Sequence, residues 1–382
     1  MATWTGDSDR LRILHAVTLL TPDGAYGGPV RVSLNQASAL RIRGHSVTLA
    51  AAERGFDVRP TWAEGTPLVV RPAVRVVPRP GFAGLTAPGL LAWFLRAHGD
   101  FQAAHVHLAR DLVLLPLAVA MMRAKLPYVV QAHGMILPGA HPFADRMIVR
   151  KLLCRAHEVF YLTTDEHDAL DEVAGGNARL TPLPNGVPLY QAATYSRRVP
   201  EVLYLGRLHQ RKRPVDFVAA AKELNARGIT ADYTLIGPDE GEGRKVQEVA
   251  AQAPNINWVG PIESGAGPAR MRQASIFVLP SVSPEPYPMA VLEAMSVGLP
   301  VVVTDQCGLA PMIRKYDCGI VIEPGPSNIA RAVEHLVSAP DIARKMGERG
   351  RSAVKHDLGM SYVGQRLEMS YSAAARVRRW LP

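Results

Sequence analysis

The 382-residue chain is longer than one ordinary domain, so two domains are the first expectation. Its apolar share of 48% and charged share of 20% exclude a disordered, collagen-like or low-complexity protein. The 43 basic and 34 acidic residues give a net charge of +9, which fits anionic partners such as nucleic acid, phosphate ligands or lipid, and equally a mixed solvated surface.

Short β-rich runs alternate with segments of helical length from residue 11 onward. In the first half the strand-like runs are residues 11–17, 46–50, 105–108, 128–132 and 158–162. After a less patterned stretch, such runs return at residues 202–205, 233–236, 256–259, 276–279, 301–304 and 320–322. The alternation predicts an α/β fold: two Rossmann-like, doubly wound parallel-sheet domains that face a central cleft.

We place the N-terminal domain at residues 1–190, the C-terminal domain at 191–360, and a final helix at 361–382. The polar N-terminus lacks the charged and apolar regions of a secretion signal. The longest apolar run, 112–122, is about half the ~20 residues that cross a bilayer. No cysteine pair has disulfide-framework or zinc-site spacing, which favours a cytoplasmic protein. The three cysteines are Cys154, Cys307 and Cys318.

A Tyr-Gly-Gly-Pro segment at 26–29 follows the first predicted strand and opens a helix at about residue 30. Gly27 and Gly28 permit close backbone approach, and the positive end of the helix favours a phosphate. The alternative is a simple turn. The segment is not the G-x-G-x-x-G of a dinucleotide-binding protein.

Cations gather after the first strand of the second half, where Arg207 and Lys212 could neutralise a pyrophosphate. The alternative is a solvated loop before a helix. Further on, Glu285 lies in a proline-rich loop and Glu293 in the helix expected to start near Pro288, so that two carboxylates would flank one ligand. Here the alternative is a capping or solvated pair.

Taken together, these motifs resemble family 4 retaining glycosyltransferases of the GT-B type, which consist of two Rossmann-like domains. The resemblance covers about residues 11–360, and it implies that the final helix at 361–382 crosses back to the N-terminal domain. It is carried, in the family's order, by residues 26–29, Gly-His-Ser-Val at 44–47, Leu-Pro-Asn-Gly-Val at 183–187, Arg207 with Lys212, Glu285 with Glu293, and Gly-Leu-Pro-Val-Val at 298–302.

The resemblance implies roles for particular residues. Arg207 and Lys212 would hold the diphosphate of a UDP- or GDP-linked sugar, with help from the backbone of Gly27 and Gly28. Glu293 would bind the ribose hydroxyls and Glu285 the hydroxyls of the transferred sugar. The remaining contacts would be backbone groups of Met289 and Ala290 to sugar or phosphate, the base near Gly237 and Ile262, and His133 at the reaction centre, with His107 as a structural or acceptor-side residue.

The family's chemistry implies a hexosyltransferase-like enzyme that needs no metal and no cofactor beyond the nucleotide-sugar. Transfer would retain configuration through an oxocarbenium-like, same-face substitution, in which the leaving diphosphate helps to deprotonate the acceptor hydroxyl. In agreement, the sequence has no cluster at metal-ligand spacing, and its single D-x-D triplet, Asp7-Ser8-Asp9, lies in the polar N-terminal stretch ahead of the first predicted strand. Three positions depart from the family pattern: Pro188 replaces an aspartate, Pro288 a glycine, and Gln-Cys-Gly at 306–308 a Gly-Gly loop.

By resemblance, the acceptor is a glycan, a lipid-linked sugar or a small molecule, in bacterial-type envelope polysaccharide, glycolipid or related biosynthesis. The loop 79–85 and a basic segment at 146–155 would provide peripheral contact with the inner face of a membrane. In that segment Arg146, Arg150, Lys151 and Arg155 alternate with Met147, Ile148, Leu152 and Leu153. The cations spread over half the helical wheel, so an ordinary core-packing helix with a basic face is the alternative.

Other functions on this scaffold are a sugar-nucleotide epimerase and a non-catalytic protein that binds sugar nucleotides or glycans. The Glu285 and Glu293 pair disfavours the first, and the set of five charged or titratable site residues disfavours the second. A dehydrogenase is disfavoured because its glycine fingerprint is missing after the first strand. The diphosphate expected at Arg207 and Lys212 also replaces nucleic acid as the anionic partner.

Overall fold

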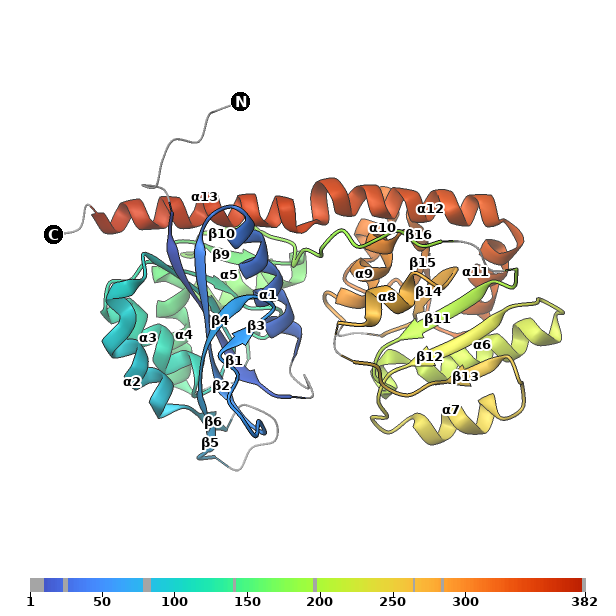
Figure 1. Ribbon diagram of the computed structural model, residues 1–382, viewed down its shortest axis with the longest axis horizontal. Coiled ribbons are helices and arrows are strands. Elements are labelled where there is room, and N and C mark those ends of the chain that lie inside the picture. Colours follow the sequence, from blue (N-terminus) through green and yellow to red (C-terminus); the bar gives the residue numbers. More distant parts are fainter. Residues whose placement is uncertain are drawn as a thin grey trace. The chain divides into compact units, whose positions relative to one another are not determined.

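The structure is a computed structural model that describes residues 10–22, 27–77, 84–139, 142–194, 198–263, 265–282 and 285–379. It divides into two compact units, the first made of residues 1–186 and 360–382 and the second of residues 187–359 (Figure 1). The sequence analysis placed these boundaries at residues 190 and 360. Tyr26, Pro284 and most of the loop 79–85 lie outside the described residues.

Among the described residues, the strands of unit 1 form a sheet in the order β10-β9-β8-β7-β1-β2-β4-β3. All its pairings are parallel except β3 with β4. Its strands are β1 (Arg12–Leu20), β2 (Ser46–Glu53), β3 (Trp62–Ala63), β4 (Thr66–Pro72), β7 (Ala103–His107), β8 (Tyr128–Gln131), β9 (Val159–Tyr161) and β10 (Leu180–Pro182), and β5 (Val74–Arg75) pairs separately with β6 (Leu85–Thr86).

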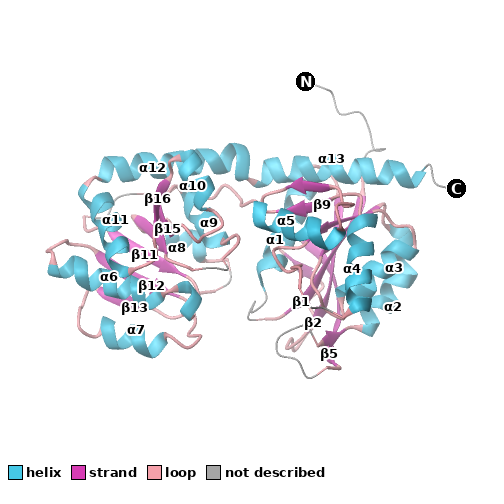
Figure 2. Cartoon of the chain, turned by 180° about the vertical axis from the view of Figure 1, so that it is seen from behind, coloured by secondary structure: helices cyan, strands magenta, loops and turns pink. Residues whose placement is uncertain are grey.

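Helices cover both faces of this sheet (Figure 2). They are α1 (Gly27–Ile42), α2 (Pro88–Ala97), α3 (Leu114–Arg123), α4 (Phe143–Arg155), α5 (Thr164–Ala174) and α13 (Met360–Arg379). Successive side chains of a strand point to opposite faces. On β1, Leu14 packs into the core beneath α2 to α5, and Ile13 packs into the core beneath α1 and α13. His15 lies two residues after Ile13 on the same strand, so its side chain points to the face that α1 and α13 cover.

Unit 2 is a parallel sheet in the order β13-β12-β11-β14-β15-β16. Its strands are β11 (Glu201–Leu205), β12 (Asp232–Ile236), β13 (Ile256–Trp258), β14 (Ile276–Leu279), β15 (Val301–Thr304) and β16 (Gly319–Ile322). Its helices are α6 (Pro214–Ala226), α7 (Gly243–Ala250), α8 (Gly267–Met271), α9 (Met289–Val297), α10 (Ala310–Tyr316), α11 (Pro326–Ser338) and α12 (Pro340–Ala353).

Both sheets are doubly wound, so each has a point at which the strand order reverses. In unit 2 it lies between β11 and β14, and in unit 1 between β1 and β7. At such a point the two neighbouring crossovers run to opposite sides, which leaves a crevice at the carboxyl ends of the strands. A ligand is therefore expected beside the residues that follow β11 and β14 in unit 2 and β1 and β7 in unit 1.

Candidate active site

In unit 2, the predicted site residues follow four neighbouring strands at the same edge of the sheet. Arg207 follows β11, Gly237 follows β12, Ile262 follows β13, and Glu285 follows β14. The carboxyl ends of parallel strands meet at one edge, and the β11 and β14 loops flank the point of strand reversal. The topology thus gathers residues that are up to 78 positions apart in the chain, from Arg207 to Glu285.

An ion pair joins the loops after β11 and β14. Lys212 ends a short 3₁₀ turn, and its Nζ lies 2.5 Å from Oε2 of Glu285. The two side chains are only 14% and 10% exposed. The same loops are tied by the backbone, since the amide of Val282 donates to the carbonyl of Arg211 at 2.9 Å. The pair is therefore fixed by two loops and largely shielded from water.

The backbone of Glu285 is held from a second side by the loop after β15. The amide of Gly308 donates to the carbonyl of Glu285 at 3.0 Å. A Cβ atom on Gly308 would lie 1.9 Å from the carbonyl oxygen of Pro286, so only glycine fits here. Cys307 is buried beside them, and burial raises the pKa of its thiol to about 11. The Gln-Cys-Gly loop, which departs from the family pattern, thus positions Glu285.

Glu285 retains acceptor capacity in this arrangement. Its Oε2 contacts Lys212 as an ion pair but has no partner with hydrogen-bond geometry in the part of the chain that the structure describes. A carboxylate has about four lone-pair sites, and a buried one without partners is costly. Glu285 can therefore accept hydrogen bonds from a ligand's hydroxyl groups while Lys212 compensates its charge.

Arg207 has a different partner from Lys212. Its Nη1 lies 2.9 Å from Oε1 of Glu240, and the side chains are 48% and 34% exposed. Exposed pairs of this kind contribute about 0–1 kcal/mol, so Arg207 can exchange Glu240 for a phosphate at little cost. The sequence analysis missed Glu240, because nothing in its local pattern relates it to Arg207.

Helix α9 supplies backbone donors beside Glu285. It begins at Met289, and none of the described side chains caps it. The first amides of a helix, including those of Met289 and Ala290, lack intrahelical acceptors and favour an anion. Pro288 is the N-cap residue. Its missing N–H therefore removes no intrahelical hydrogen bond, and the amides of Met289 and Ala290 are the ones left to meet an anion.

Glu293 and Gly237 complete the predicted set in unit 2. Glu293 is half-buried in α9, and a Cβ atom on Gly267 would lie 3.5 Å from its Oε2, so the start of α8 borders this carboxylate. Gly237 has φ +147° and approaches so closely that a Cβ atom would lie 2.0 Å from the carbonyl oxygen of Gly206. Ile262 is half-buried after β13. Gly237 is thus required by the fold itself.

In unit 1, α1 begins at Gly27, ahead of the start near residue 30 that the sequence predicted, so Gly27 and Gly28 form its first turn. A Cβ atom on Gly28 would meet no atom of the described residues within 4 Å. Contacts within the unit therefore do not explain glycine at this position, in contrast to Gly237 and Gly308. The open space is compatible with close approach of a ligand to the backbone.

His133 follows β8 in a strained turn. Its φ is +52° and that of Gly134 is +74°, and the left-handed region is unfavourable for a non-glycine residue. Glu166 stabilises the turn, because its Oε1 accepts from the amide of Gly134 at 2.5 Å and its Oε2 from that of Leu162 at 2.7 Å. The sequence analysis missed Glu166. The signal was a Thr-x-x-Glu capping pattern that starts at Thr163.

Three buried histidines lie behind His133 on the face covered by α1 and α13. They are His15 on β1 and His105 and His107 on β7. Nδ1 of His107 lies 2.8 Å from Nε2 of His133. Burial lowers the pKa of His15 to about 3 and that of His133 to about 4, and it holds the pKa values of His105 and His107 well below 6.5. All four imidazoles are therefore neutral at physiological pH.

Nitrogen atoms of His15, His105 and His107 lie within 4.8 Å of one another, a grouping that the sequence analysis did not find. Zinc would require one bare nitrogen of each ring within ~2.0–2.1 Å of the metal. His15 and His107 already use both ring nitrogens in hydrogen bonds to neighbouring side chains, and His105 uses one. Hydrogen bonding accounts for the grouping, and we assign no metal to it.

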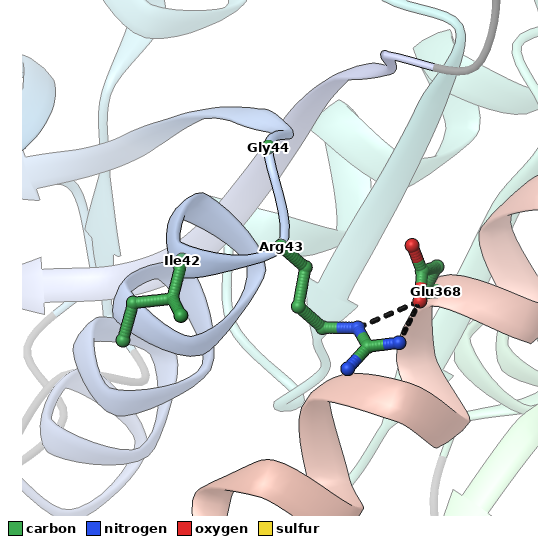
Figure 3. A pocket seen from close by; sticks show the side chains of 4 residues that line it. All are labelled: Ile42, Arg43, Gly44 and Glu368. Atoms are coloured by element: carbon green, nitrogen blue, oxygen red, sulfur yellow. Dashed lines mark hydrogen bonds and ion pairs between the residues drawn. The ribbon is translucent and has the colours of Figure 1, made fainter. Parts of the chain in front are cut away.

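A shallow pocket of about 490 Å³ lies elsewhere on unit 1, between the end of α1 and α13 (Figure 3). Ile42, Arg43, Gly44 and Glu368 line it. Arg43 and Glu368 pair with each other across it, and His45 contacts the same carboxylate at 3.0 Å. Its charges are thus internally satisfied, and it contains none of the predicted site residues.

Comparison with known proteins identifies the family. A model described as "Glycosyl transferase 4-like domain" matches residues 27–186, and one described as "Glycosyl transferases group 1" matches residues 195–353. The chain is a family 4 glycosyltransferase of the GT-B type. The two matches together span both units, and they contain the predicted site residues of each.

Relatives and solved structures agree with this assignment. The chain is 24% identical over 374 residues to a phosphatidyl-myo-inositol mannosyltransferase of Mycobacterium tuberculosis, covering 91% of this chain and 94% of that protein. It is 26% identical over 329 residues to an alpha-D-kanosaminyltransferase of Streptomyces kanamyceticus, covering 76% and 83%.

Two solved structures share the fold of this glycosyltransferase. Sucrose-phosphate synthase of Thermosynechococcus elongatus superposes with a TM-score of 0.75 at 18% identity, over 96% of this chain and 100% of that one. Anabaena HepE in complex with UDP and glucose superposes with a TM-score of 0.73 at 18% identity, over 95% and 100%. Among the described residues, no helix is long and apolar enough to span a membrane.

Proposed function

We propose that this glycosyltransferase moves a hexose from a UDP- or GDP-linked donor to an acceptor hydroxyl, with retention of configuration. The observation that supports this best is the shielded pair of Lys212 and Glu285 at the point of strand reversal in unit 2. A cation for a diphosphate and a carboxylate for sugar hydroxyls lie side by side there. The acceptor belongs to polysaccharide, glycolipid or related glycoconjugate biosynthesis, as the phosphatidyl-myo-inositol mannosyltransferase named above illustrates for its own substrate.

The residues of unit 2 divide the work of stabilising the leaving group. Arg207 and Lys212 neutralise the diphosphate, and the first amides of α9 donate to it. Negative charge grows on the diphosphate as the glycosidic bond breaks, so preorganised cations and dipoles lower the barrier. Glu293 binds the ribose hydroxyls, and Glu285 positions the transferred sugar. The scheme requires no divalent metal, because the protein supplies the positive charge itself.

Proton transfer in this scheme does not depend on His133. Burial lowers its pKa to about 4, so its imidazole is a weak base. The leaving diphosphate, on the same face of the sugar as the acceptor, takes the hydroxyl proton. His133 then shapes the reaction centre, and Gly27 and Gly28 bring backbone amides toward the diphosphate.

The donor class can be tested directly. We expect the protein to release UDP or GDP from one member of a panel of UDP-, GDP- and ADP-sugars, and to do so equally well in EDTA. Release without acceptor is slow hydrolysis, and a hydroxyl acceptor accelerates it. Interconversion of two sugar nucleotides without release would establish an epimerase, and binding without turnover would establish a non-catalytic protein; either result contradicts the proposal.

Helix α4 supports a second part of the proposal, which is peripheral contact with a membrane. The structure buries Leu152 and Leu153 in the core, contrary to their place in the predicted membrane-facing set. Phe143, Met147 and Ile148 are instead 76%, 51% and 40% exposed. These three side chains define an apolar surface, and the exposed cations of the same helix accompany it: Arg146, Arg150, Lys151 and Arg155. Apolar side chains beside cations are typical of helices that lie in a membrane interface.

Replacing both Phe143 and Met147 with serine is expected to reduce flotation with anionic liposomes by on the order of 10-fold, because the helix loses its apolar contact. Ile342→Ser is the matched control, since Ile342 is a 42% exposed residue of α12 in the other unit. Neutral liposomes should bind the wild type, the double variant and the control weakly. Equal flotation of the wild type, the double variant and the control would exclude α4 as a membrane contact.

A further inference from the structure

A continuous chain of hydrogen bonds leads from helix α13 to His133 within unit 1. Nδ1 of His105 lies 2.7 Å from the hydroxyl oxygen of Tyr371, which lies 3.2 Å from Nε2 of His15. Nδ1 of His15 lies 3.5 Å from Nε2 of His107 and 3.1 Å from Oγ of Ser33. The other nitrogen of His107 reaches Nε2 of His133 at 2.8 Å.

The last link has the geometry of an in-plane hydrogen bond. The rings of His107 and His133 are tilted by only 6°, and their centroids are 5.1 Å apart. The distance of 2.8 Å between the two nitrogens, plus the distance from each nitrogen to the centre of its own ring, equals the separation of the centroids. The two rings therefore meet edge to edge along the hydrogen bond. His105 and His107, by contrast, are stacked face to face at 4.4 Å.

A second chain reaches His133 through amide side chains. Nε2 of Gln36 donates to Oε1 of Gln131 at 2.9 Å, and Nε2 of Gln131 donates to Oδ1 of Asn185 at 3.0 Å. Burial lowers the pKa of His133, and the neighbouring side chain of Asn185 acts in the opposite sense, as an acceptor beside the ring does. Since Nε2 of His133 faces His107, its Nδ1 is the atom left for Asn185. The two chains therefore converge on one imidazole.

The atoms at the ends of the two chains decide which partner donates in each hydrogen bond. Each chain ends in a buried atom that has no partner among the described residues: Nε2 of His105 ends the first chain and Oε1 of Gln36 ends the second. If every hydrogen bond in the two chains is donated in the direction of His133 and Asn185, these two end atoms carry no proton and are bare acceptors. The opposite direction would turn both ends into buried N–H groups without acceptors, which are rarer and more costly in proteins than unfilled acceptors. A neutral imidazole has one donor nitrogen and one acceptor nitrogen, so a ring that accepts at one nitrogen donates from the other, and the same direction continues to the next ring.

We propose that His107 is a positioning residue that holds His133 in the tautomer with the proton on Nδ1, which Asn185 accepts, and with a bare Nε2 that accepts from His107. The tautomers are assigned from the hydrogen-bond network. His133 then has both nitrogens engaged within unit 1. It offers the reaction centre a fixed, neutral ring instead of a proton acceptor. This consequence for catalysis rests on the proposed glycosyltransferase reaction, whereas the tautomer does not.

The tautomer can be measured on the full-length protein labelled with ¹⁵N-histidine. Two-bond ¹H–¹⁵N spectra distinguish a protonated ring nitrogen from a bare one, and a His133→Asn variant identifies the resonances of His133. We expect a protonated Nδ1 and a bare Nε2 at neutral pH. A protonated Nε2, or a mixture of tautomers in the wild type, would overturn the assignment, and this measurement requires no variant of His107 to fold.

Two substitutions of His107 separate its two hydrogen bonds. The amide of His107→Asn occupies the place of Nδ1 and can still donate to His133, whereas that of His107→Gln reaches the place of Nε2 and meets only His15. We expect His133 to keep its tautomer in His107→Asn and to lose it in His107→Gln. The kcat should fall on the order of 10-fold in the glutamine variant alone, with KM for the donor unchanged.

The outcomes separate this inference from the proposed function. Equal spectra and equal kcat in the two variants would overturn the role of His107. If neither the wild type nor any variant releases a nucleotide diphosphate from any donor, the proposed function fails, but the tautomer of His133 is still decided by the spectra. Stoichiometric zinc bound to the histidine cluster of the purified protein would also overturn the inference, because a metal would displace the hydrogen bonds.

Discussion

Replacement of Lys212 by alanine is expected to slow release of the nucleotide diphosphate by about 10²- to 10³-fold, which is the effect of removing one preorganised group that stabilises developing charge. Lys212 is 14% exposed and lies in a shielded pair, so its charge is little screened by solvent. The variant also leaves Glu285 without its cation, and we expect a loss of about 1–3 kcal/mol in unfolding free energy. Steady-state kinetics and urea unfolding measure the two effects separately.

Two further variants give the comparison its controls. Glu285→Gln keeps the shape and part of the hydrogen bonding of the side chain, so a smaller loss, on the order of 10-fold, is expected. Lys222→Ala removes an exposed lysine of α6 in the same unit and should change neither quantity. If Lys212→Ala lost stability but turned over the donor at the wild-type rate, the pair with Glu285 would be a purely structural feature.

Acid is expected to unfold unit 1 steeply, because four of its histidines must be neutral in the folded state. The pKa of His15 is lowered to about 3 and that of His133 to about 4, with His105 and His107 also well below 6.5. Below pH 6.5 the unfolded chain takes up protons that the folded state excludes, so stability falls as the pH drops from 6.5 toward about 4. Each histidine contributes a slope of about 1.4 kcal/mol per pH unit.

Two buried acids act in the opposite sense. Burial raises the pKa values of Asp111 and Glu166, so the folded state binds their protons more readily than the unfolded chain does and their stability contribution grows in acid. They offset part of the effect of the four histidines. Urea unfolding at several pH values should therefore still show a net loss of stability between pH 6.5 and about 4.

His105→Asn isolates one histidine of the four. Asparagine retains a donor near the position of Nδ1 for Tyr371 but cannot titrate, so the slope of unfolding free energy against pH should decrease by about 1.4 kcal/mol per unit. The exposed His335 of α11 provides the matched control, and His335→Asn should leave the slope unchanged. A wild-type stability that is flat between pH 6.5 and about 4 would show that the histidines are not buried as neutral groups.

The sequence predicted the strands whose signal is continuous. The apolar runs 202–205, 276–279 and 301–304 correspond to β11, β14 and β15, because a strand buried on both faces needs apolar residues at every position. β4 was missed, since Pro67 and Pro72 give its segment the composition of a loop. It lies next to the short β3 at the sheet edge, where proline is tolerated because fewer backbone amides must pair.

The site was predictable only as separate motifs. Lys212 and Glu285 carry local signals, but their direct contact depends on the strand order, which places β11 beside β14. The histidine chain was less accessible still. His107 and His133 were noticed, whereas the link between His15 and Tyr371 joins residues 356 positions apart and requires both the sheet and helix α13.

The chain enters unit 2 at Val187 and leaves it at Gly359, and these two residues form an isolated parallel bridge. Unit 2 is thus one uninterrupted stretch, while unit 1 needs helix α13 to complete the core that contains Val363, Leu367 and Tyr371. During synthesis, unit 2 can therefore complete its fold before unit 1, although it emerges later from the ribosome. A fragment that stops at residue 186 would expose that apolar face, and the two units should be produced separately only if residues 360–382 are joined to the first.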